Sequence, residues 1–301
     1  MLTSPSRRSE LTPNGLYIEP CTLCPLECAL CYTAHDQQRL LDTRWIRRAI
    51  AIYAEALETV GVFWCGLGEV LYDRRFAPLL DELDERYGDK LVHVIQTSGQ
   101  VPQSAVLERP GHRFFAVSID LPVPFNEQHR GVGYTERAEA FISRALRNGA
   151  LGVQIKSLLT LAHLPELAES FQALQQRLAK RSGRSMSEIQ NLVTLEPILP
   201  FQRDEVSQIA STAFVPQGGT EDRAALLEAV KTHLPERWAY LRDRPRTIEL
   251  SVTADGLFNC CEAVEKIGSL TELSSLDHSS VLDRLLHSMS QCEACALQGV
   301  C

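Results

Sequence analysis

The sequence predicts an α/β fold, because strand-like apolar segments alternate with helix-like segments over the first two thirds of the chain. Six strand-like segments carry this prediction, namely GLYIEP, VGVFWC, LVHVIQ, FFAVSID, GVQIKSLLTL and NLVTLEPIL. A helix-like run follows each of them, and units of roughly 30–40 residues imply parallel strands joined by right-handed crossovers. Functional groups are then expected at the carboxyl ends of the strands.

Composition and charge exclude several classes of protein. The chain has 301 residues, of which 45% are hydrophobic and 23% charged, so it is neither disordered, collagen-like nor a coiled coil. No apolar run approaches the ~18 residues that span a bilayer, and the N-terminus lacks the apolar core of a secretory signal. The net charge of −8 disfavours duplex nucleic acid as a partner. We therefore expect a cytoplasmic protein with no membrane or nucleic-acid partner.

The ten cysteines form two clusters, separated by the isolated Cys65. A reducing compartment disfavours disulfides, and core thiols have no reason to recur at short fixed spacings. The clustering therefore predicts two metal sites. The first cluster is Cys21, Cys24, Cys28 and Cys31, and the second is Cys260, Cys261, Cys292, Cys295 and Cys301.

The first cluster contains the pattern C-x3-C-x2-C at Cys24, Cys28 and Cys31, followed by Tyr32. Three thiolates on one loop can hold three irons of a [4Fe–4S] cube and leave the fourth iron open, whereas a structural zinc site normally takes four protein ligands. A zinc pair of Cys21 with Cys24 is the alternative; otherwise Cys21 is expected to pack beside the loop.

This pattern resembles the radical S-adenosylmethionine (SAM) superfamily. The resemblance implies a partial (βα)6 TIM-like barrel, here residues 1–201, in which the open iron chelates SAM. It also implies a 5′-deoxyadenosyl radical that abstracts hydrogen from the substrate, and an external electron donor such as flavodoxin or ferredoxin. Tyr32, after the last cysteine, belongs to the implied cofactor site.

A second motif follows the second strand as Gly66, Gly68 and Glu69. It resembles the Gly-Gly-Glu motif of the superfamily, in which glycines let backbone carbonyls approach the amino group of SAM and a carboxylate lies near that ammonium. The alternative is an ordinary strand-to-helix turn.

Polar residues at the ends of the later strands extend the candidate site. The stretch from Ser118 and Asp120 to Arg130 resembles the S-x-D…H-x-x-R-G stretch of many radical SAM enzymes. Ser118 and Arg130 are predicted to contact SAM and Asp120 the substrate; the alternative is a structural Asp120–Arg130 ion pair. Lys156 and Glu196 are predicted to point into the lumen and hold a polar substrate, or else to face a helix layer or solvent.

The C-terminal segment predicts a second metal site. Residues 202–245 read as a helical linker, and residues 246–301 read as a β-hairpin with an Asp-Gly turn, a helix and the last cysteines. This segment resembles the SPASM/twitch extension, with one auxiliary [4Fe–4S] cluster on Cys261, Cys292, Cys295 and Cys301; zinc is the alternative. Neighbouring strand residues point to opposite faces, so Cys260 is free to donate a hydrogen atom, or Cys261 if ligation is reversed.

The substrate is predicted only by analogy. Few residues precede Cys24, so we expect no leader-peptide-recognition domain and a small molecule, for which a cationic aminoglycoside is the candidate. A cysteine hydrogen donor predicts an epimerase of antibiotic biosynthesis. The alternatives are an alcohol dehydrogenase that uses the auxiliary cluster as electron acceptor, a ribosomal-peptide maturase, and an iron–sulfur electron carrier or redox sensor.

Overall fold

The computed structural model describes residues 15–28, 31, 38–101, 104–108, 111, 113–158, 160–198, 228, 229, 231–233, 235, 249–259 and 266–292. The chain divides into two compact units. The first comprises Met1–Leu23, Gln38–His93 and Leu241–Cys301, and the second comprises Cys24–Gln37 and Val94–Tyr240. Strand β3 (Leu91–Thr97) begins in the first unit and ends in the second.

The first unit contains strands in the order β2-β1-β7-β8-β9. β1 pairs in parallel with both β2 and β7, whereas β7–β8 and β8–β9 are antiparallel. The expected hairpin with its Asp-Gly turn is therefore present as β7 and β8, and it extends the sheet of β1 through β7. The bounds of these strands are β1 (Gly15–Ile18), β2 (Val60–Trp64), β7 (Leu250–Thr253), β8 (Gly256–Phe258) and β9 (Lys266–Gly268).

Helix α1 (Thr43–Ala56) shows how the sequence forms this unit. It begins where the Asp42 side chain accepts a hydrogen bond from the backbone N–H of Arg44 at 2.9 Å, which satisfies one free donor of the first turn. Ile46, Ile50 and Tyr53 recur at helical spacing and are fully buried. The other helices are α2 (Phe76–Tyr87) and α10 (His278–Cys292), with short 3-10 helices η2 (Val70–Tyr72), η3 (Gly88–Lys90) and η5 (Thr271–Ser274).

A buried hydrogen-bonded chain of three side chains holds the middle of this unit. Trp64 Nε1 donates to His93 Nδ1 at 2.9 Å, and His93 Nε2 lies 3.0 Å from Asp84 Oδ1. An indole nitrogen can only donate, so His93 Nδ1 accepts and Nε2 carries the ring hydrogen toward Asp84. This chain fixes the tautomer of a fully buried histidine.

The second unit contains strands in the order β3-β4-β5-β6, with β4–β5 and β5–β6 parallel. The new strands are β4 (Arg113–Ser118), β5 (Gly152–Leu158) and β6 (Val193–Ile198). The helices are α3 (Ser104–Glu108), α4 (Val123–Arg130), α5 (Tyr134–Arg147), α6 (Leu167–Ser182) and α7 (Met186–Leu192), with the short 3-10 helix η4 (Leu164–Glu166). Parallel strands joined by helices confirm the predicted α/β class.

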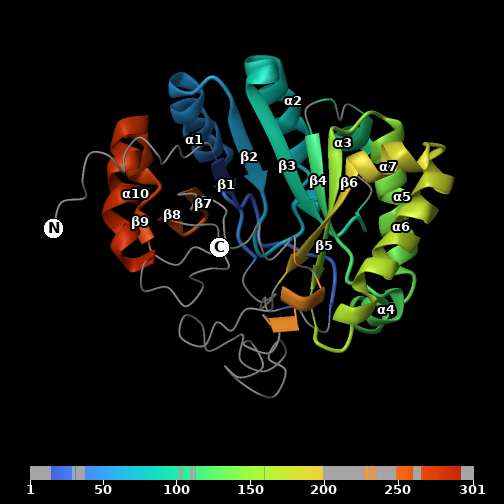
Figure 1. Cartoon of the computed structure of the whole chain (residues 1–301). Coiled ribbons are helices and arrows are strands. Elements are labelled where there is room, and N and C mark those ends of the chain that lie inside the picture. Colours follow the sequence, from blue (N-terminus) through green and yellow to red (C-terminus); the bar gives the residue numbers. More distant parts are fainter. Residues whose placement is uncertain are drawn as a thin grey trace. The chain divides into compact units, whose positions relative to one another are not determined.

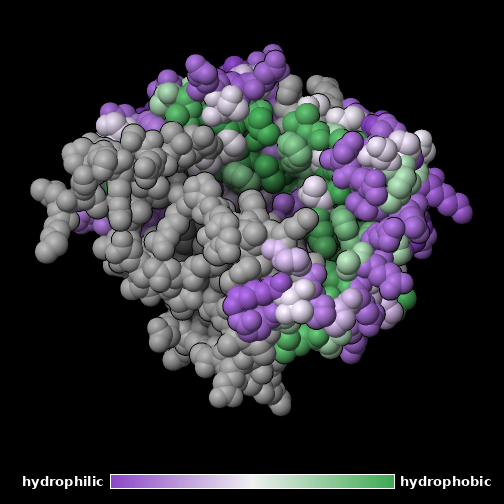
Figure 2. Space-filling model, in the orientation of Figure 1, coloured by the Kyte–Doolittle hydropathy of each residue, from purple (hydrophilic) through white to green (hydrophobic). Residues whose placement is uncertain are grey.

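One face of the strands β4 to β6 packs on helices. Val117 and Ile155 are in register on this face and fully buried, and the Phe115 ring meets Phe141 of α5 edge-on with centroids 5.3 Å apart. Each buried side chain of this size contributes about 1.5–3 kcal/mol. Figure 1 shows α5 and α6 along this side of the strands, and hydrophilic residues gather on the outer surface of these helices at the right of Figure 2.

The remaining features of the fold are the lengths of the described helices and the extent of the expected linker. Within the described residues, every helix is too short or too polar to cross a bilayer. Of the expected linker at residues 202–245, the structure describes only residues 228, 229, 231–233 and 235.

Candidate functional site

The cysteine loop belongs to the second unit from Cys24 onward. The thiols of Cys24, Cys28 and Cys31 are each half-buried, and the backbone N–H of Cys31 donates to the Cys28 carbonyl at 2.9 Å. Among the described residues, no three His, Cys, Asp or Glu side chains converge closely enough to hold a single metal ion. A four-iron cube takes its ligands at separate corners, so three thiols on one loop could hold three of its irons.

The Cys28 thiol shows the electrostatics of this loop. Burial raises the pKa of Cys28, the charge of Arg130 lowers it, and the neighbouring Cys31 raises it again; the net direction is upward. A thiolate here therefore needs a cation, and Arg130 supplies part of that charge. An iron cluster would supply the rest.

The loop at Gly66–Glu69 in the first unit presses against the chain that enters the cysteine loop. The backbone N–H of Glu69 donates to the Leu23 carbonyl at 2.7 Å. A Cβ on Gly68 would lie 2.6 Å from the carbonyl oxygens of both Cys21 and Leu23, so only glycine fits. Gly66 has φ +138°, which also favours glycine. Gly68 thus serves a close backbone approach to residues 21–23, whereas Gly66 lies against the Glu19 side chain.

Two buried side chains, those of Glu69 and Cys21, complete this contact. Glu69 Oε1 accepts the backbone N–H of Leu71 at 3.2 Å and caps η2. The Cys21 thiol donates to the carbonyls of Leu23 at 3.9 Å and Glu69 at 3.8 Å. Burial raises the pKa of Cys21 to about 12, so this sulfur stays a thiol. Cys21 therefore packs against Leu23 and Glu69, and its expected packing beside the cysteine loop stays a prediction.

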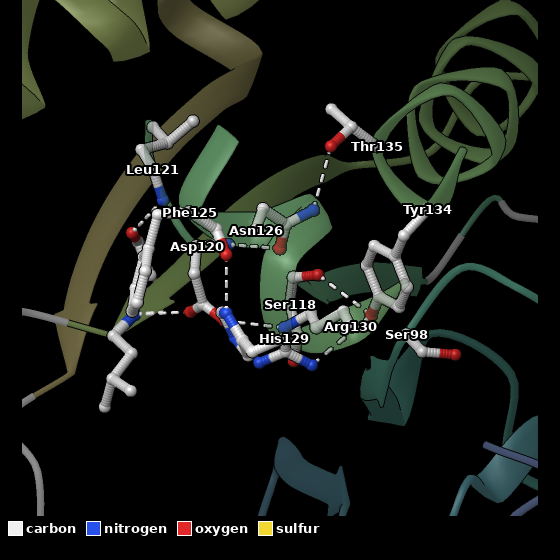
Figure 3. Close-up of polar contacts among 12 residues, drawn as sticks. Ser98, Ser118, Asp120, Leu121, Phe125, Asn126, His129, Arg130, Tyr134 and Thr135 are labelled. Atoms are coloured by element: carbon white, nitrogen blue, oxygen red, sulfur yellow. Dashed lines mark hydrogen bonds and ion pairs between the residues drawn. The ribbon is translucent and has the colours of Figure 1, made fainter. Parts of the chain in front are cut away.

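Asp120 lies just after β4 and has 1% of its surface exposed. Its Oδ2 lies 2.7 Å from His129 Nε2 and 2.6 Å from Arg130 Nε. Its Oδ1 accepts the backbone N–H of Leu158, the last residue of β5, at 2.6 Å. Figure 3 shows these groups converging on the carboxylate, which joins the end of β4 to β5 and α4.

In this cluster Asp120 and Arg130 each stabilise the charged form of the other. Burial raises the pKa of Asp120, but the hydrogen bond from His129 and the charge of Arg130 outweigh it and hold the pKa below its ordinary value. Burial lowers the pKa of Arg130, and the charge of Asp120 outweighs that effect. The ion pair between the two, considered from the sequence as a structural alternative, is present.

Arg130 and His129 are each held by a second contact. Arg130 Nη1 donates to the Tyr134 hydroxyl at 3.4 Å, and the guanidinium lies 5.4 Å from the centroid of that ring. The Tyr134 hydroxyl donates in turn to the Ser118 carbonyl at 3.1 Å. His129 Nδ1 lies 2.7 Å from the Phe125 carbonyl oxygen. Both partners of the imidazole are acceptors, so both contacts are hydrogen bonds only when both ring nitrogens carry hydrogen.

The junction of α4 and α5 holds these residues in place. Asn126 is fully buried; its Oδ1 accepts the backbone N–H of Asp120 at 2.9 Å, and its Nδ2 donates to Thr135 Oγ1 at 2.8 Å. Glu127 accepts the backbone N–H groups of Thr135, at 2.7 Å, and of Gly133. Burial raises the pKa of Glu127, but these hydrogen bonds outweigh burial and hold the pKa below its ordinary value. The turn between the helices is therefore closed by side chains of α4.

Ser118, Lys156 and Glu196 form a row across β4, β5 and β6. The parallel register pairs Ser118 with Lys156 and Lys156 with Glu196, so the three side chains leave the sheet on the same face. This face is opposite the one that packs on α5, and all three residues are half-buried. Gln154 Nε2 donates to Glu196 Oε2 at 3.3 Å. The residues predicted to face the lumen, Lys156 and Glu196, are thus neighbours. Ser118 and Lys156 each lie two residues before a partner of the Asp120–Leu158 contact.

Sequence reasoning missed the residues that hold Asp120 and Arg130. His129, Asn126 and Tyr134 had no assigned role, because their partners lie on other elements. The only local signal was a histidine directly before Arg130, within a stretch already singled out.

Several predicted site residues lie outside the described part of the chain. These are Tyr32 and the cysteines Cys260, Cys261, Cys295 and Cys301. Of the second cluster, only the backbone of Cys292 is described, as the last residue of α10. The auxiliary site therefore stays a prediction.

No protein-family model matches this chain, and no curated protein matches it. Solved structures share its fold at low sequence identity. Native anSMEcpe with bound AdoMet matches with a TM-score of 0.64 at 14% identity, over 95% of this chain and 88% of that chain. SuiB of Streptococcus suis bound to S-adenosylmethionine matches with a TM-score of 0.62 at 16% identity, over 98% and 74%. SuiB bound to the precursor peptide SuiA gives 0.61 at 15%, over 98% and 73%. The chain therefore has the partial TIM-like barrel fold of these proteins.

Proposed function

We propose that this chain is a radical SAM enzyme. The observation that carries the proposal is the loop of three half-buried thiols, Cys24, Cys28 and Cys31, in which the charge of Arg130 acts on the Cys28 thiol. The fold shared with two SAM-bound proteins supports it.

In this proposal the three cysteines hold a [4Fe–4S] cluster that leaves one iron for SAM. A cluster and SAM held there would supply the chemistry of hydrogen-atom abstraction from the substrate. Arg130 binds an anionic group of SAM, because its guanidinium retains N–H donors beyond the one that Asp120 accepts. Asp120 and His129 act by holding Arg130 in place. The Gly66–Glu69 loop offers backbone carbonyls to the amino group of SAM.

The test is reconstitution under anaerobic conditions. We expect about four irons per first cluster in the wild type, a change in the electron paramagnetic resonance (EPR) spectrum of the reduced cluster on addition of SAM, and formation of 5′-deoxyadenosine with dithionite. Cys28→Ser should lose all three. A cluster that ignores SAM would instead support the electron carrier or redox sensor, and bound zinc without iron would support a structural metal site.

One candidate substrate is a small polar natural product. A cationic aminoglycoside would be epimerised at one carbon, with Cys260 donating hydrogen, while Cys261, Cys292, Cys295 and Cys301 hold an auxiliary [4Fe–4S] cluster. Turnover in deuterated water then gives one deuterium at an inverted carbon, and Cys260→Ala abolishes it. A product two mass units lighter without deuterium would identify a dehydrogenase instead.

A peptide is the second candidate, and one observation favours it. SuiB, which shares this fold over 98% of this chain, has been solved with its precursor peptide SuiA. A peptide substrate predicts SAM-dependent modification of a short peptide and no turnover of aminoglycosides. Mass spectrometry of both panels with one enzyme preparation separates the two candidates. An external flavodoxin or ferredoxin is the proposed reductant in either case.

A further inference from the structure

The row formed by Ser118, Lys156 and Glu196 has at its centre a half-buried lysine whose ammonium group has no partner among the described residues. Lys156 is half-buried on the face of β5 opposite α5, where charged side chains are costly unless paired. Its ammonium group forms no hydrogen bond or ion pair with any residue that the structure describes. Lysines in such positions extend their charge to water or to an anionic partner.

The neighbouring carboxylate does not neutralise Lys156. Glu196 is in register with it on β6, and adjacent strands lie about 4.8 Å apart. Glu196 nevertheless accepts from Gln154 Nε2 at 3.3 Å, and no ion pair with Lys156 is formed among the described residues. Gln154 precedes Lys156 by two residues on β5, so this hydrogen bond draws the carboxylate toward the preceding row.

The other neighbour in the row is a donor. Ser118, in register on β4, is half-buried, and among the described contacts its hydroxyl has no partner; the Tyr134 hydroxyl donates to its backbone carbonyl, not to its side chain. A hydroxyl and an ammonium side by side on one face form a pair of hydrogen-bond donors with a positive charge. Such a pair complements a carboxylate.

We propose that Lys156 binds a carboxylate of the substrate, with Ser118 beside it. The inference rests on the proposed function, since it places a substrate at the carboxyl ends of β4 to β6, and it adds the class of substrate. A substrate that carries a carboxylate near the reacting carbon would supply the anion that Lys156 binds. A peptide with an acidic residue or a free C-terminus is such a substrate. A purely cationic aminoglycoside does not, because it would bring positive charge against an uncompensated ammonium.

The carboxylate of SAM is the other source of the same chemistry, and the Asp120–Arg130 cluster distinguishes the two. Arg130 is held at the end of β4 by Asp120, with Nε 2.6 Å from Oδ2, and the proposed function already places the anionic group of SAM at this guanidinium. Lys156 lies two residues before Leu158, whose backbone N–H donates to Asp120, and is thus one row further from that cluster along the strand.

The test uses the reconstituted enzyme and three variants, Lys156→Gln, Lys156→Arg and Lys180→Gln. Lys180 lies exposed on α6, so its variant is a control for loss of one positive charge. The probes are short peptides in matched pairs, with aspartate against asparagine and free C-terminus against C-terminal amide. Peptide-stimulated 5′-deoxyadenosine formation gives the KM of each probe, and the EPR change of the cluster gives the Kd for SAM.

We expect the carboxylate member of a pair to be preferred by the wild type and by Lys180→Gln. Lys156→Gln should raise its KM about 10- to 100-fold, the loss typical of one charged hydrogen bond, with an unchanged Kd for SAM. Lys156→Arg should recover most of the preference. A rise in the Kd for SAM in Lys156→Gln would overturn the proposal and assign Lys156 to SAM. Equal KM values for both members of every pair, or turnover of aminoglycosides alone, would also overturn it. Loss of SAM cleavage in the wild type would instead refute the proposed function itself.

Discussion

Replacement of Asp120 by asparagine tests whether the cluster around this carboxylate stabilises the second unit. The carboxylate is almost completely buried, pairs with Arg130 at 2.6 Å and accepts the Leu158 N–H at 2.6 Å. An asparagine keeps the shape, but it removes the charge and turns an amide N–H₂ toward donors. Breaking a buried ion pair by removing one partner costs about 3–5 kcal/mol. The Arg130 side chain is 21% exposed, so water replaces part of the lost contact and we expect a loss of about 3 kcal/mol.

The assay is urea unfolding at pH 7, with the free energy of unfolding obtained by linear extrapolation. Glu85→Gln is the matched control, because Glu85 is exposed on α2 and its replacement also removes one negative charge. The control should remain within about 0.5 kcal/mol of the wild type. A loss below about 1 kcal/mol in Asp120→Asn would refute the reasoning that this buried cluster holds β4, β5 and α4 together.

The pH dependence gives the same prediction an independent check. The pKa of Asp120 is lowered in the folded protein, so its contribution is present above the unfolded pKa and is lost as the pH falls through the folded pKa. An unfolded aspartate titrates near about pH 3.9. The difference in unfolding free energy between wild type and Asp120→Asn should therefore stay constant from about pH 7 to 5 and shrink below about pH 4.

Three further substitutions test the first unit. Gly68→Ala places a Cβ 2.6 Å from the carbonyls of Cys21 and Leu23, so we expect a loss of about 1–3 kcal/mol in urea unfolding and a lower iron content after reconstitution. Trp64→Phe leaves the buried Nδ1 of His93 without its donor and should cost about 1–3 kcal/mol in the same measurement. Cys21→Ala should retain the iron content of the wild type, because its thiol donates to backbone carbonyls and its pKa of about 12 opposes a thiolate.

Each of these has a control and a contrary outcome. Gly111→Ala meets open space and should leave stability unchanged; equal losses at Gly68 and Gly111 would refute the steric argument. The double variant Trp64→Phe/His93→Leu should recover much of the loss, since both partners are then apolar. Cys28→Ala should lose iron, and an iron loss in Cys21→Ala as large as this one would mean that Cys21 is a ligand.

Local features of the molecule follow directly from sequence. The alternation of strands and helices predicts the parallel α/β fold, and residues 246–258 predict the β7–β8 hairpin, because both depend on neighbours along the chain. The cysteine loop is recognisable for the same reason: Cys24, Cys28 and Cys31 are close in sequence, so their spacing already limits what they can hold.

The tertiary structure decided which distant residues meet. Asp120 and Leu158 are brought together by the pairing of β4 with β5, and the strand register aligns Lys156 with Ser118 and Glu196 on the face opposite α5. From sequence, Lys156 could face the lumen, a helix layer or solvent, because periodicity alone does not say which face of a strand is covered. Pairing of β7 with β1 was likewise invisible, since it joins segments over 200 residues apart. Local spacing carries the prediction of an iron–sulfur site, whereas strand register decided which distant side chains share one face of the sheet.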